Sequence, residues 1–374
     1  MRVLVVNTGS SSLKLRLLDA DDRVVATLDL EEWAGGGASD RVAAFVAEHG
    51  APDAVGHRVV HGGPTFHEPV VLDAESRKVL EGLTDLAPLH QPRALAGIDA
   101  VTDALPDTPA VACFDTSFHA DLPPAAATYA VPHEWTTRWR LRRYGFHGLS
   151  HGYAARRAAA MVGRPVEELR LVSCHLGAGA SLAAVSGGRS VDTTMGFTPL
   201  EGLVMASRSG SVDPGMLLWL VQHEGMDVGE LSEALSHRAG LAGFVGGTGD
   251  MREVLSAARS GDRLAALAFD VYLHQLRKHI AAMAAAMSGL DVLIFTGGVG
   301  EHQPPVRSAA AAGLGFLGVR LDEDRNANTD SASASASATG DADIGDPTAP
   351  VRTLVIAARE DLEIARMTRA ALAS

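Results

Sequence analysis

One pattern occurs twice in this chain and limits the folds open to it: an apolar strand, a turn of small residues, a second strand and another turn. The first copy covers residues 3–17 and continues to a turn at residues 21–22. The second covers residues 171–182 and continues to a turn at residues 187–189. Apolar runs and strict alternation are typical of buried and half-buried strands. Because helical patterns follow both copies, we expect a duplicated α/β domain; two unrelated glycine-turn hairpins are the alternative.

The first of these turns, within residues 7–14, has the composition of an anion site. Its glycine and serines leave backbone N–H groups accessible, and the hydroxyls add donors. Lys14 follows, and it is one of few lysines among 32 basic residues; such a compact point charge suits phosphate. The P-loop pattern is absent. The turn predicts a phosphate site of another kind, which would face the second turn across a cleft; an ordinary polar hairpin is the alternative.

Length and composition favour a globular protein of two domains. The 374 residues are 47% hydrophobic and 21% charged, with a formal net charge of −13. This acidity argues against nucleic acid and anionic membranes as general partners. Cys113 and Cys174 lie in apolar runs, so we expect core residues rather than a disulfide or metal pair. The start of the chain in a strand and the charges in the longest helical pattern, residues 263–287, predict a cytoplasmic protein without signal peptide or membrane span.

Strand and helix patterns alternate along the rest of the chain. We expect strands at residues 24–28, 54–64 (ending in a glycine turn), 110–114, 292–296 and 351–357, and helices at residues 40–49, 75–83, 93–104, 263–287, from 304 onward and at 362–372. The glycine-rich residues 297–301 predict a turn at the end of a strand, which suits close contact with a nucleotide. Residues 331–337 alternate Ser and Ala, which predicts a flexible surface loop.

Three charged residues lie where charge is unusual. Arg58 is in the middle of an apolar strand, where an unpaired arginine would be unfavourable; it is either half of a buried ion pair or an anion clamp. Arg208 lies in a loop of small residues before a helix, where its planar fork suits carboxylate or phosphoryl oxygens. Asp115 ends a buried strand and either enters a site or caps the next helix.

Other polar residues have a structural and a functional interpretation. His147 lies in a glycine-flanked turn, where a lone histidine is often structural, and Asp250 precedes Arg252 at a position that also suits a helix N-cap. His57 and His61 are four residues apart, but a strand gives this spacing no shared ligand face and no third ligand is evident. We therefore expect no metal pair there.

Taken together and in this order, seven segments of the sequence resemble the acetate kinase family, and the resemblance covers essentially the whole chain. These segments are residues 7–14, 56–63, 87–90, 114–119, 143–148, 198–203 and 208–210. The resemblance implies an α/β fold of duplicated ribonuclease-H-like/actin-like domains with an interdomain cleft, as in the acetate and sugar kinase, heat-shock-chaperone and actin superfamily. It implies an N-terminal domain of residues 1–117 with 361–374, a C-terminal domain of residues 118–360, and a homodimer.

The same resemblance implies a reaction: Mg-dependent (or Mn-dependent) reversible transfer of a phosphoryl group from ATP to acetate, which gives acetyl phosphate and ADP. Matched position by position, Asn7 and Glu360 would hold the metal ion and Arg58 would bind the acetate carboxylate. Asp115 would be the active-site carboxylate. Because acetate is ionised at neutral pH, Asp115 is not needed as a base. We expect it to orient an arginine or metal-bound water, or to serve protonation in one direction of the reaction.

The resemblance assigns the remaining site residues to the transferring group and the nucleotide. His147 and Arg208 would stabilise the transition state, whose charge is spread over the equatorial phosphoryl oxygens. The nucleotide would be lined by Lys14, His175, Leu176, Gly177, Ala178, Gly179, Asp250, Met251, Arg252, Gly298, Val299, Gly300, Glu301 and His302.

Four places depart from the family pattern. Ala178, His302 and Arg359 each replace an asparagine, and Ala206-Ser207 replaces Gly-Thr. We expect all four on the nucleotide side, with His302 or Arg359 offsetting the amide donor lost at Ala178. They predict that the phosphoryl donor is bound differently, with another nucleotide or pyrophosphate as alternatives to ATP.

Three classes of function remain open. A small-carboxylate kinase is the first, and a kinase for propionate or butyrate is the second, because the sequence does not show the volume of the acyl pocket. A degenerate paralogue that only binds nucleotide is the third. The retained residues of the transfer site, Asn7, Lys14, Arg58, Asp115, His147, Arg208 and Glu360, argue against the third class.

Overall fold

The computed structural model describes residues 1–9, 12–31, 33, 37–87, 90–329 and 340–373. Contacts divide the chain into two compact units. Unit 1 comprises Met1–Ala120, Phe146–Tyr153 and Arg359–Ser374; unit 2 comprises Asp121–Gly145 and Ala154–Ala358. The domain bounds expected from the sequence, residues 1–117 with 361–374 and residues 118–360, stay a prediction.

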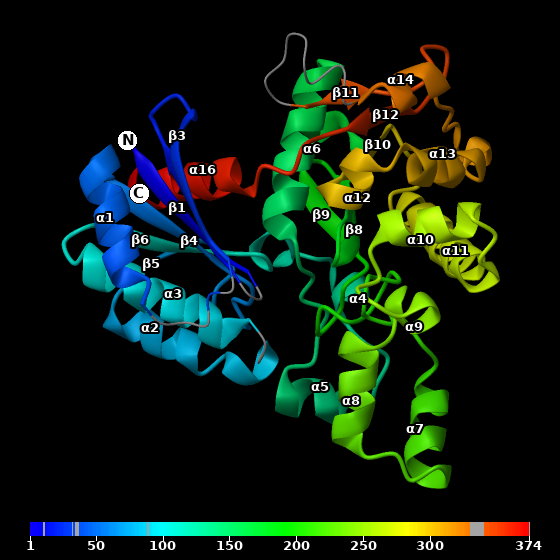
Figure 1. The fold of residues 1–374 in the computed structure, drawn as a ribbon, viewed down its shortest axis with the longest axis horizontal. Coiled ribbons are helices and arrows are strands. Elements are labelled where there is room, and N and C mark those ends of the chain that lie inside the picture. Colours follow the sequence, from blue (N-terminus) through cyan, green and yellow to red (C-terminus); the bar gives the residue numbers. More distant parts are fainter. Residues whose placement is uncertain (10–11, 32, 34–36, 88–89, 330–339, 374) are drawn as a thin grey trace. The chain divides into compact units, whose positions relative to one another are not determined.

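Unit 1 is built on a six-stranded sheet of order β3-β2-β1-β4-β6-β5 (Figure 1). Its strands are β1 Val3–Thr8, β2 Leu13–Leu18, β3 Val24–Leu30, β4 Ala54–Val59, β5 Val70–Val71 and β6 Ala110–Phe114. The first three strands form an antiparallel meander, and β1, β4 and β6 are parallel neighbours. The carboxyl ends of three parallel strands therefore meet at one edge of the sheet.

Helices cover both faces of this sheet, as the alternation of apolar side chains requires. The helices are α1 Ser39–His49, α2 Ala74–Glu81, α3 Gln91–Ala104 and α16 Glu360–Ala373, with the start of α6 Gly148–Val162 and the 3₁₀ turns Thr84–Leu86 and Ser117–His119. Leu4 and Val6 of β1 face the core shared with α1. Val3 and Val5 face the opposite core, which includes Ile364 of α16.

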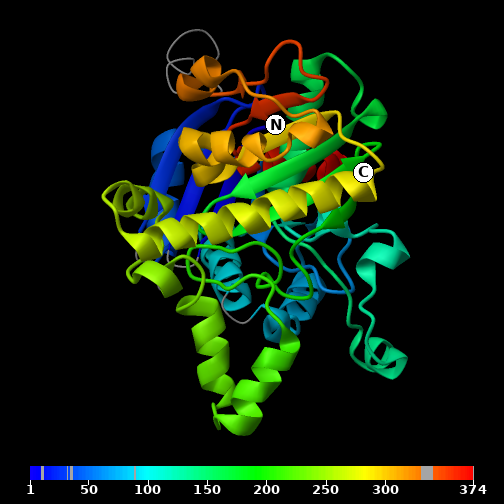
Figure 2. The same cartoon turned by 90° about the vertical axis from the view of Figure 1, so that its right-hand side faces the viewer.

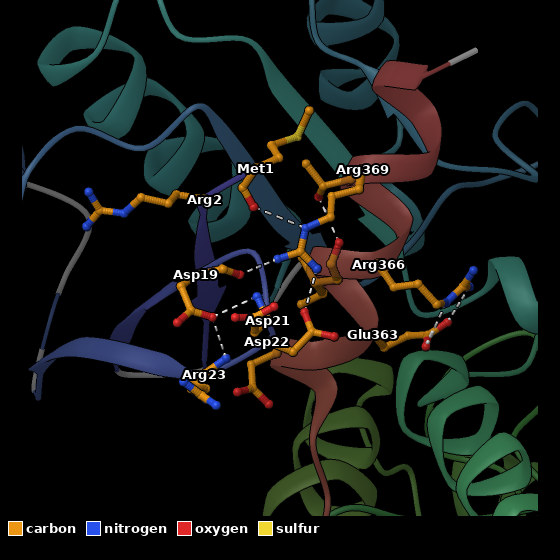
Figure 3. A network of polar contacts seen from close by, with 12 residues as sticks. Met1, Arg2, Asp19, Asp21, Asp22, Arg23, Glu363, Arg366 and Arg369 are labelled. Carbon is orange, nitrogen blue, oxygen red and sulfur yellow. Dashed lines mark hydrogen bonds and ion pairs between the residues drawn. The ribbon is translucent and has the colours of Figure 1, made fainter.

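The C-terminal helix α16 is fixed to unit 1 by a network of polar contacts (Figure 3). The guanidinium of Arg369 donates to the carbonyl of Met1 at 3.2 Å, to the carbonyl of Asp19 at 2.7 Å and to the carboxylate of Asp22. Because these partners lie at the start of β1 and in the β2–β3 turn, the helix has a defined register on the sheet. This register also fixes the position of Glu360, the first residue of the helix.

Unit 2 repeats the topology of unit 1 in a sheet of order β11-β12-β10-β7-β8-β9. Its strands are β7 Arg170–Leu176, β8 Ala180–Ser186, β9 Arg189–Thr193, β10 Val292–Thr296, β11 Ala342–Asp343 and β12 Arg352–Val355. Again three antiparallel strands precede two parallel neighbours and a short antiparallel edge strand. Even the register shift in the second hairpin recurs, at Leu17/Leu18 and at Ala184/Val185. The predicted duplicated α/β fold is confirmed.

The helices of unit 2 include one of 24 residues, α11, which lies along β7 and β8 (Figure 2, yellow). The helices are α4 Pro124–Ala127, α5 His133–Trp139, α7 Pro214–His223, α8 Val228–His237, α9 Ala242–Val245, α10 Met251–Arg259, α11 Arg263–Ala286, α12 Gly297–His302, α13 Pro304–Ala312 and α14 Glu323–Ala327, with 3₁₀ turns at Val166–Glu168 and Gly315–Leu317. Within the described ranges, no helix is long and apolar enough to cross a membrane.

One predicted element is wrong, and several predictions lie outside the described residues. Residues 297–301 were expected to form a turn, but they begin the helix α12. Gly297 has a φ of +76°, and a Cβ there would lie 2.8 Å from the carbonyl oxygen of Leu176, so the glycine lets the helix start against β7. The Ser/Ala tract at 331–337, part of the first turn (10–11) and residues 88–89 are among those not described. Both cysteines are buried and free, as predicted.

Candidate active site

Three predicted site residues lie together at the carboxyl ends of the parallel strands of unit 1. Asn7 and Arg58 are near the ends of β1 and β4, and Asp115 directly follows β6. Side chains alternate along a strand, so these three share the face that packs on α16. The N-terminal residue of that helix is Glu360, a fourth predicted residue. The topology thus explains how residues far apart in sequence meet.

The guanidinium of Arg58 is the centre of this group. Its Nε and Nη2 donate to Oδ1 and Oδ2 of Asp115 at 3.0 and 2.7 Å, a bidentate pair. Its Nη1 donates to Oδ1 of Asn7 at 3.3 Å and lies 3.3 Å from Oε2 of Glu360. Asn7 Nδ2 also donates to Oε2 of Glu360 at 3.3 Å. The four side chains form one hydrogen-bonded network, which we call the Arg58 network.

Burial gives the Arg58 network its electrostatic character. The side chains of Arg58, Asp115 and Glu360 are 17%, 2% and 13% exposed. Burial by itself lowers the pKa of Arg58, but Asp115 and Glu360 outweigh it and the pKa is raised. Burial raises the pKa of Glu360, against the opposing effect of Arg58. Both oxygens of Asp115 are used by Arg58, so the helix-cap alternative for Asp115 is wrong.

The oxygen atoms of the Arg58 network fit a magnesium ion that a nucleotide brings with it. Mg²⁺ is bound through one or two carboxylates together with substrate phosphates and water, rather than by a complete protein cage. Asn7 and Glu360 contribute an amide oxygen and a carboxylate oxygen, Oδ1 and Oε2, each 3.3 Å from Nη1 of Arg58. No cluster of three or more His, Cys, Asp or Glu ligands occurs in the part of the chain that the structure describes.

His147 is joined to this group through the backbone. It has a φ of +57° and precedes α6. The N–H of Gly148 donates to the carbonyl of Asp115 at 2.8 Å, so two motifs from distant parts of the sequence are adjacent.

The first turn belongs to the same region of the sheet. Lys14 is the cross-strand partner of Asn7 in the β1–β2 hairpin, so both side chains lie on one face. Gly9 N–H donates to the carbonyl of Ser12 at 2.8 Å, which closes the turn. The side chain of Lys14 is exposed.

Unit 2 contains a cavity of about 480 Å³, within the size range of small-molecule sites. Eight predicted nucleotide residues line it, namely Gly177, Ala178, Asp250, Met251, Arg252, Gly298, Val299 and His302. Others of the predicted set, His175, Leu176, Gly179, Gly300 and Glu301, do not line it. Glu301 accepts a hydrogen bond from the N–H of Ala358 at 3.0 Å instead.

The eight predicted residues of the cavity come from three local structures: the β7–β8 turn, the start of α10 and the helix α12. Asp250 caps α10 by accepting from Arg252 N–H at 2.8 Å, so the N-cap interpretation is confirmed. The N–H of Ala206 donates to the carbonyl of Ala178 at 3.1 Å, which closes one wall. Sequence reasoning missed Leu241 and Tyr272, which line the cavity from segments without a recognisable motif; it also missed Thr248, Gly249 and Gln303.

Three of the four departures from the family pattern meet at this cavity. Ala178, Ala206 and His302 all line it. Arg359 does not: it belongs to unit 1, and its Nε and Nη2 donate to Asp361 at 2.9 and 2.8 Å. That His302 or Arg359 offsets the donor lost at Ala178 stays a prediction.

Arg208 is a partly buried cation in unit 2. Its Nη1 donates to the carbonyl of Pro199 at 3.0 Å and contacts Sδ of Met205 at 3.8 Å. Across the described ranges, no Asp or Glu pairs with it, and burial lowers its pKa. A buried charge without a counter-ion is unfavourable, so this site suits an incoming anion.

Comparison with known proteins gives a consistent result. The model of the acetokinase family matches residues 38–366. The acetate kinases of Clavibacter michiganensis subsp. michiganensis and Synechococcus sp. are each 46% identical, over at least 98% of both chains. Among solved structures, the acetate kinase of Porphyromonas gingivalis matches with 34% identity and a TM-score of 0.89, over 99% of each chain. A propionate kinase of Francisella tularensis subsp. tularensis matches with 34% identity and a TM-score of 0.88, also over 99% of each chain.

Proposed function

The chain belongs to the acetokinase family, whose members are kinases that transfer phosphate to a carboxylate, and we propose that it is an acetate kinase. The reaction is reversible phosphoryl transfer from MgATP to acetate, which gives acetyl phosphate and ADP. The observation that carries the proposal is the Arg58 network, which gathers a bidentate arginine, an amide oxygen of Asn7 and a carboxylate oxygen of Glu360 at one edge of a sheet.

In this proposal unit 1 binds the carboxylate and the metal. Arg58 binds acetate, and Asp115 orients the guanidinium through both of its oxygens rather than acting as a base. Asn7 and Glu360 would hold the metal ion, which would supply positive charge to the phosphoryl groups of the nucleotide. Lys14, on the same face as Asn7, adds positive charge near the phosphates.

Arg208 and His147 stabilise the charge that develops on the transferring group. An acetate oxygen attacks the γ-phosphorus in line, and the bond to the ADP oxygen breaks as the new P–O bond forms. Donors are needed at the equatorial oxygens, and an arginine in this role contributes about 10³- to 10⁵-fold in rate. Among the residues that the structure describes, no carboxylate compensates the charge of Arg208. This makes Arg208 the better of the two arginines for stabilising the transferring group.

Unit 2 binds the nucleotide in its cavity of about 480 Å³. Apolar walls at Leu241, Met251 and Val299 suit a base, and glycines allow close approach of the backbone to phosphates. Because three departures from the family pattern line this cavity, we propose that the affinity for ATP differs from the usual one, with GTP or pyrophosphate as alternative donors.

A coupled assay separates these possibilities. Hydroxylamine traps acyl phosphate as the hydroxamate, and the assay is run with acetate, propionate and butyrate against ATP, GTP and pyrophosphate. The expected result is hydroxamate formation that is fastest with acetate and depends on Mg²⁺. Faster turnover of propionate would support the second function, which the similarity to a propionate kinase structure favours. Absence of hydroxamate with every pair would contradict the proposal and leave a protein that only binds nucleotide.

We propose further that the protein is a homodimer through α7 and α8. The structure describes every residue of both helices, and none is buried. Met216, Leu218 and Trp219 of α7 are 44%, 59% and 50% exposed, and Val228 of α8 is 68% exposed. A helix that is apolar all round is normally covered; a second copy of the chain is the occupant we propose. A cytoplasmic location stays a prediction from the sequence.

Light scattering after size exclusion tests the dimer. L218E is expected to be a folded monomer, whereas L264E, which changes an equally exposed leucine of α11 (57%), is expected to stay a dimer. A monomeric wild-type protein, or an unchanged dimer in L218E, would contradict the proposal.

A further inference from the structure

His119 ends the motif of residues 114–119, yet the proposed mechanism gives it no role. Its side chain is fully buried, and its Nε2 lies 3.1 Å from the carbonyl oxygen of Phe146. A carbonyl oxygen can only accept, so Nε2 carries the hydrogen and donates. Burial lowers the pKa of His119 to about 4, so at neutral pH the ring is neutral.

A second contact joins the same two segments on the other side of His147. The N–H of Gly148 donates to the carbonyl of Asp115 at 2.8 Å. A Cβ on Gly148 would lie 2.3 Å from that oxygen, so only glycine allows this approach. The peptides before and after His147 are therefore both tied to residues 115–119, one through the carbonyl of Phe146 and one through the N–H of Gly148.

His147 needs such anchors because its own backbone is unfavourable. Its φ of +57° lies in the left-handed region, which residues other than glycine rarely adopt. A residue in such a conformation is strained and keeps it only where the surroundings impose it. The direction of the imidazole from its Cα depends on this conformation.

We propose that His119 is a positioning residue for His147, a role that rests on the proposed function of His147 at the transferring phosphoryl group. The hydrogen bond from His119 holds the Phe146 peptide, and with Gly148 it fixes the left-handed conformation that aims the imidazole of His147. Without the donor, the carbonyl of Phe146 is left unpaired in the interior and the backbone relaxes. A misplacement of about 1 Å at a catalytic group lowers the rate by about 10²-fold.

Substitutions of different side-chain length can separate a positioning role of His119 from a contribution to stability alone. The amide nitrogen of glutamine reaches the position of Nε2, whereas that of asparagine is too short and leucine has no donor. The variants are therefore H119Q, H119N and H119L, with S117A as the matched control. The hydroxyl of Ser117 donates to the carbonyl of Phe114 at 2.8 Å, so its hydrogen bond stays within the segment of residues 114–119.

The measurements are kcat and KM in the hydroxamate assay, with thermal unfolding of each variant. H119N and H119L are expected to lose about 10- to 100-fold in kcat with KM changed less than about threefold, because substrate binding does not require His147. H119Q is expected to recover most of the rate, and S117A to stay near wild type. In an H147A background, H119L is expected to cause no further loss, because its effect acts through His147.

Each contrary outcome has a definite meaning. Equal rates in H119Q and H119N, or multiplied losses in the H147A/H119L double variant, would overturn the positioning role alone. If H119L does not fold, the comparison of H119Q with H119N decides in its place. A wild-type protein that forms no acyl phosphate would overturn the proposed function and this inference with it, whereas an active wild type with an unaffected H119N overturns the inference only.

Discussion

Two arginines of the proposed site differ in how the protein compensates their charge. Arg58 in unit 1 is bound by both oxygens of Asp115 and lies 3.3 Å from Glu360, and its pKa is raised despite burial. Arg208 in unit 2 is held by a carbonyl and a thioether, and burial lowers its pKa. One cation is neutralised by its own unit. The other has no acidic partner among the described residues of the chain.

This difference separates two tasks that a phosphoryl-transfer site must perform. An arginine that is paired with carboxylates of the protein is held in a fixed geometry. It can bind a substrate carboxylate, but its net attraction for anions is weak. An uncompensated arginine gains most when an anion arrives, and most of all when charge increases in the transition state. We therefore assign ground-state organisation to Arg58 and transition-state stabilisation to Arg208.

The largest expected effect is loss of activity without loss of stability in R208M. Removing this side chain is expected to lower kcat by about 10³-fold or more, because an arginine on the transferring group contributes about that much. The thermal midpoint is expected to stay the same or rise slightly, since no carboxylate loses its partner. Steady-state kinetics and calorimetry on one preparation check both. An R208M protein that unfolds well below wild type would mean that its charge is compensated after all.

R58M is expected to show the opposite balance, with stability lost as well as activity. Removing Arg58 leaves Asp115 and Glu360 as buried, unpaired acids, and breaking such a pair is destabilising by about 3–5 kcal/mol. Denaturant unfolding measures the loss. The control is R58M/D115N/E360Q, which removes the carboxylates too and is expected to recover more than half of it. Equal stability of R58M and wild type would break the comparison.

Acid is expected to destabilise unit 1 through its buried histidines. Burial lowers the pKa of His57 to about 3 and of His61 and His119 to about 4. These folded-state values lie below the unfolded value of about 6.5, so the unfolded state binds more protons as the pH falls. The stabilisation is complete above pH ~6.5 and is lost toward pH ~4, by up to about 1.4 kcal/mol per pH unit for each histidine.

Tryptophan fluorescence can follow this loss in unit 1. Trp33 is buried there, whereas Trp135, Trp139 and Trp219 belong to unit 2, so W135F/W139F/W219F leaves a single reporter. The test variant in that background is H61N. In the wild type, the N–H of Gly63 donates to Nδ1 of His61 at 2.8 Å, and the amide oxygen of asparagine can accept the same hydrogen bond. H61N is expected to reduce the dependence of the unfolding free energy on pH by about the contribution of one histidine. Stability that is independent of pH between 7 and 5 would contradict the expectation.

The smallest expected effect concerns the donor cavity. A178N restores the amide that the family pattern has, and it is expected to lower KM for ATP by no more than about tenfold, because one hydrogen bond contributes about 1 kcal/mol. The rate constant is expected to change little, since the proposal gives residue 178 a role in binding the donor and none in the transfer step. KM for ATP, GTP and pyrophosphate in wild type, A178N and H302N gives the measurement. A wild type with strong ATP binding and no gain in A178N would remove the hypothesis of altered donor use.

The fold was largely predictable because its signals are local. Alternation in β2 and the apolar run in β1 depend on neighbouring residues, and the same signals in β7 and β8 identify the duplication. The helix α12 was not predicted because its glycines are typical of a turn. Their actual role is to let the backbone pack closely against β7, and this contact depends on the tertiary structure.

The site was predictable in part. Arg58 and Asp115 could be singled out as charges in apolar surroundings, but their pairing depends on the adjacency of β4 and β6, which lie 57 positions apart at this point. Glu360 was assigned by family resemblance alone, because only the return of α16 to unit 1 places it beside Asn7. Leu241 and Tyr272 carry no local signal of a cavity wall. Such contacts follow from topology, which the sequence pattern does not specify.

The most direct test of the central claim is phosphorus NMR with isotopically labelled acetate. The wild-type protein is incubated with MgATP and acetate carrying ¹⁸O in both carboxylate oxygens. Direct attack predicts ADP and acetyl phosphate with one ¹⁸O bridging to phosphorus, seen as a small upfield shift of its resonance. Formation of AMP and pyrophosphate, or of no acetyl phosphate under any donor, would contradict the account of a kinase that transfers a phosphoryl group to a carboxylate.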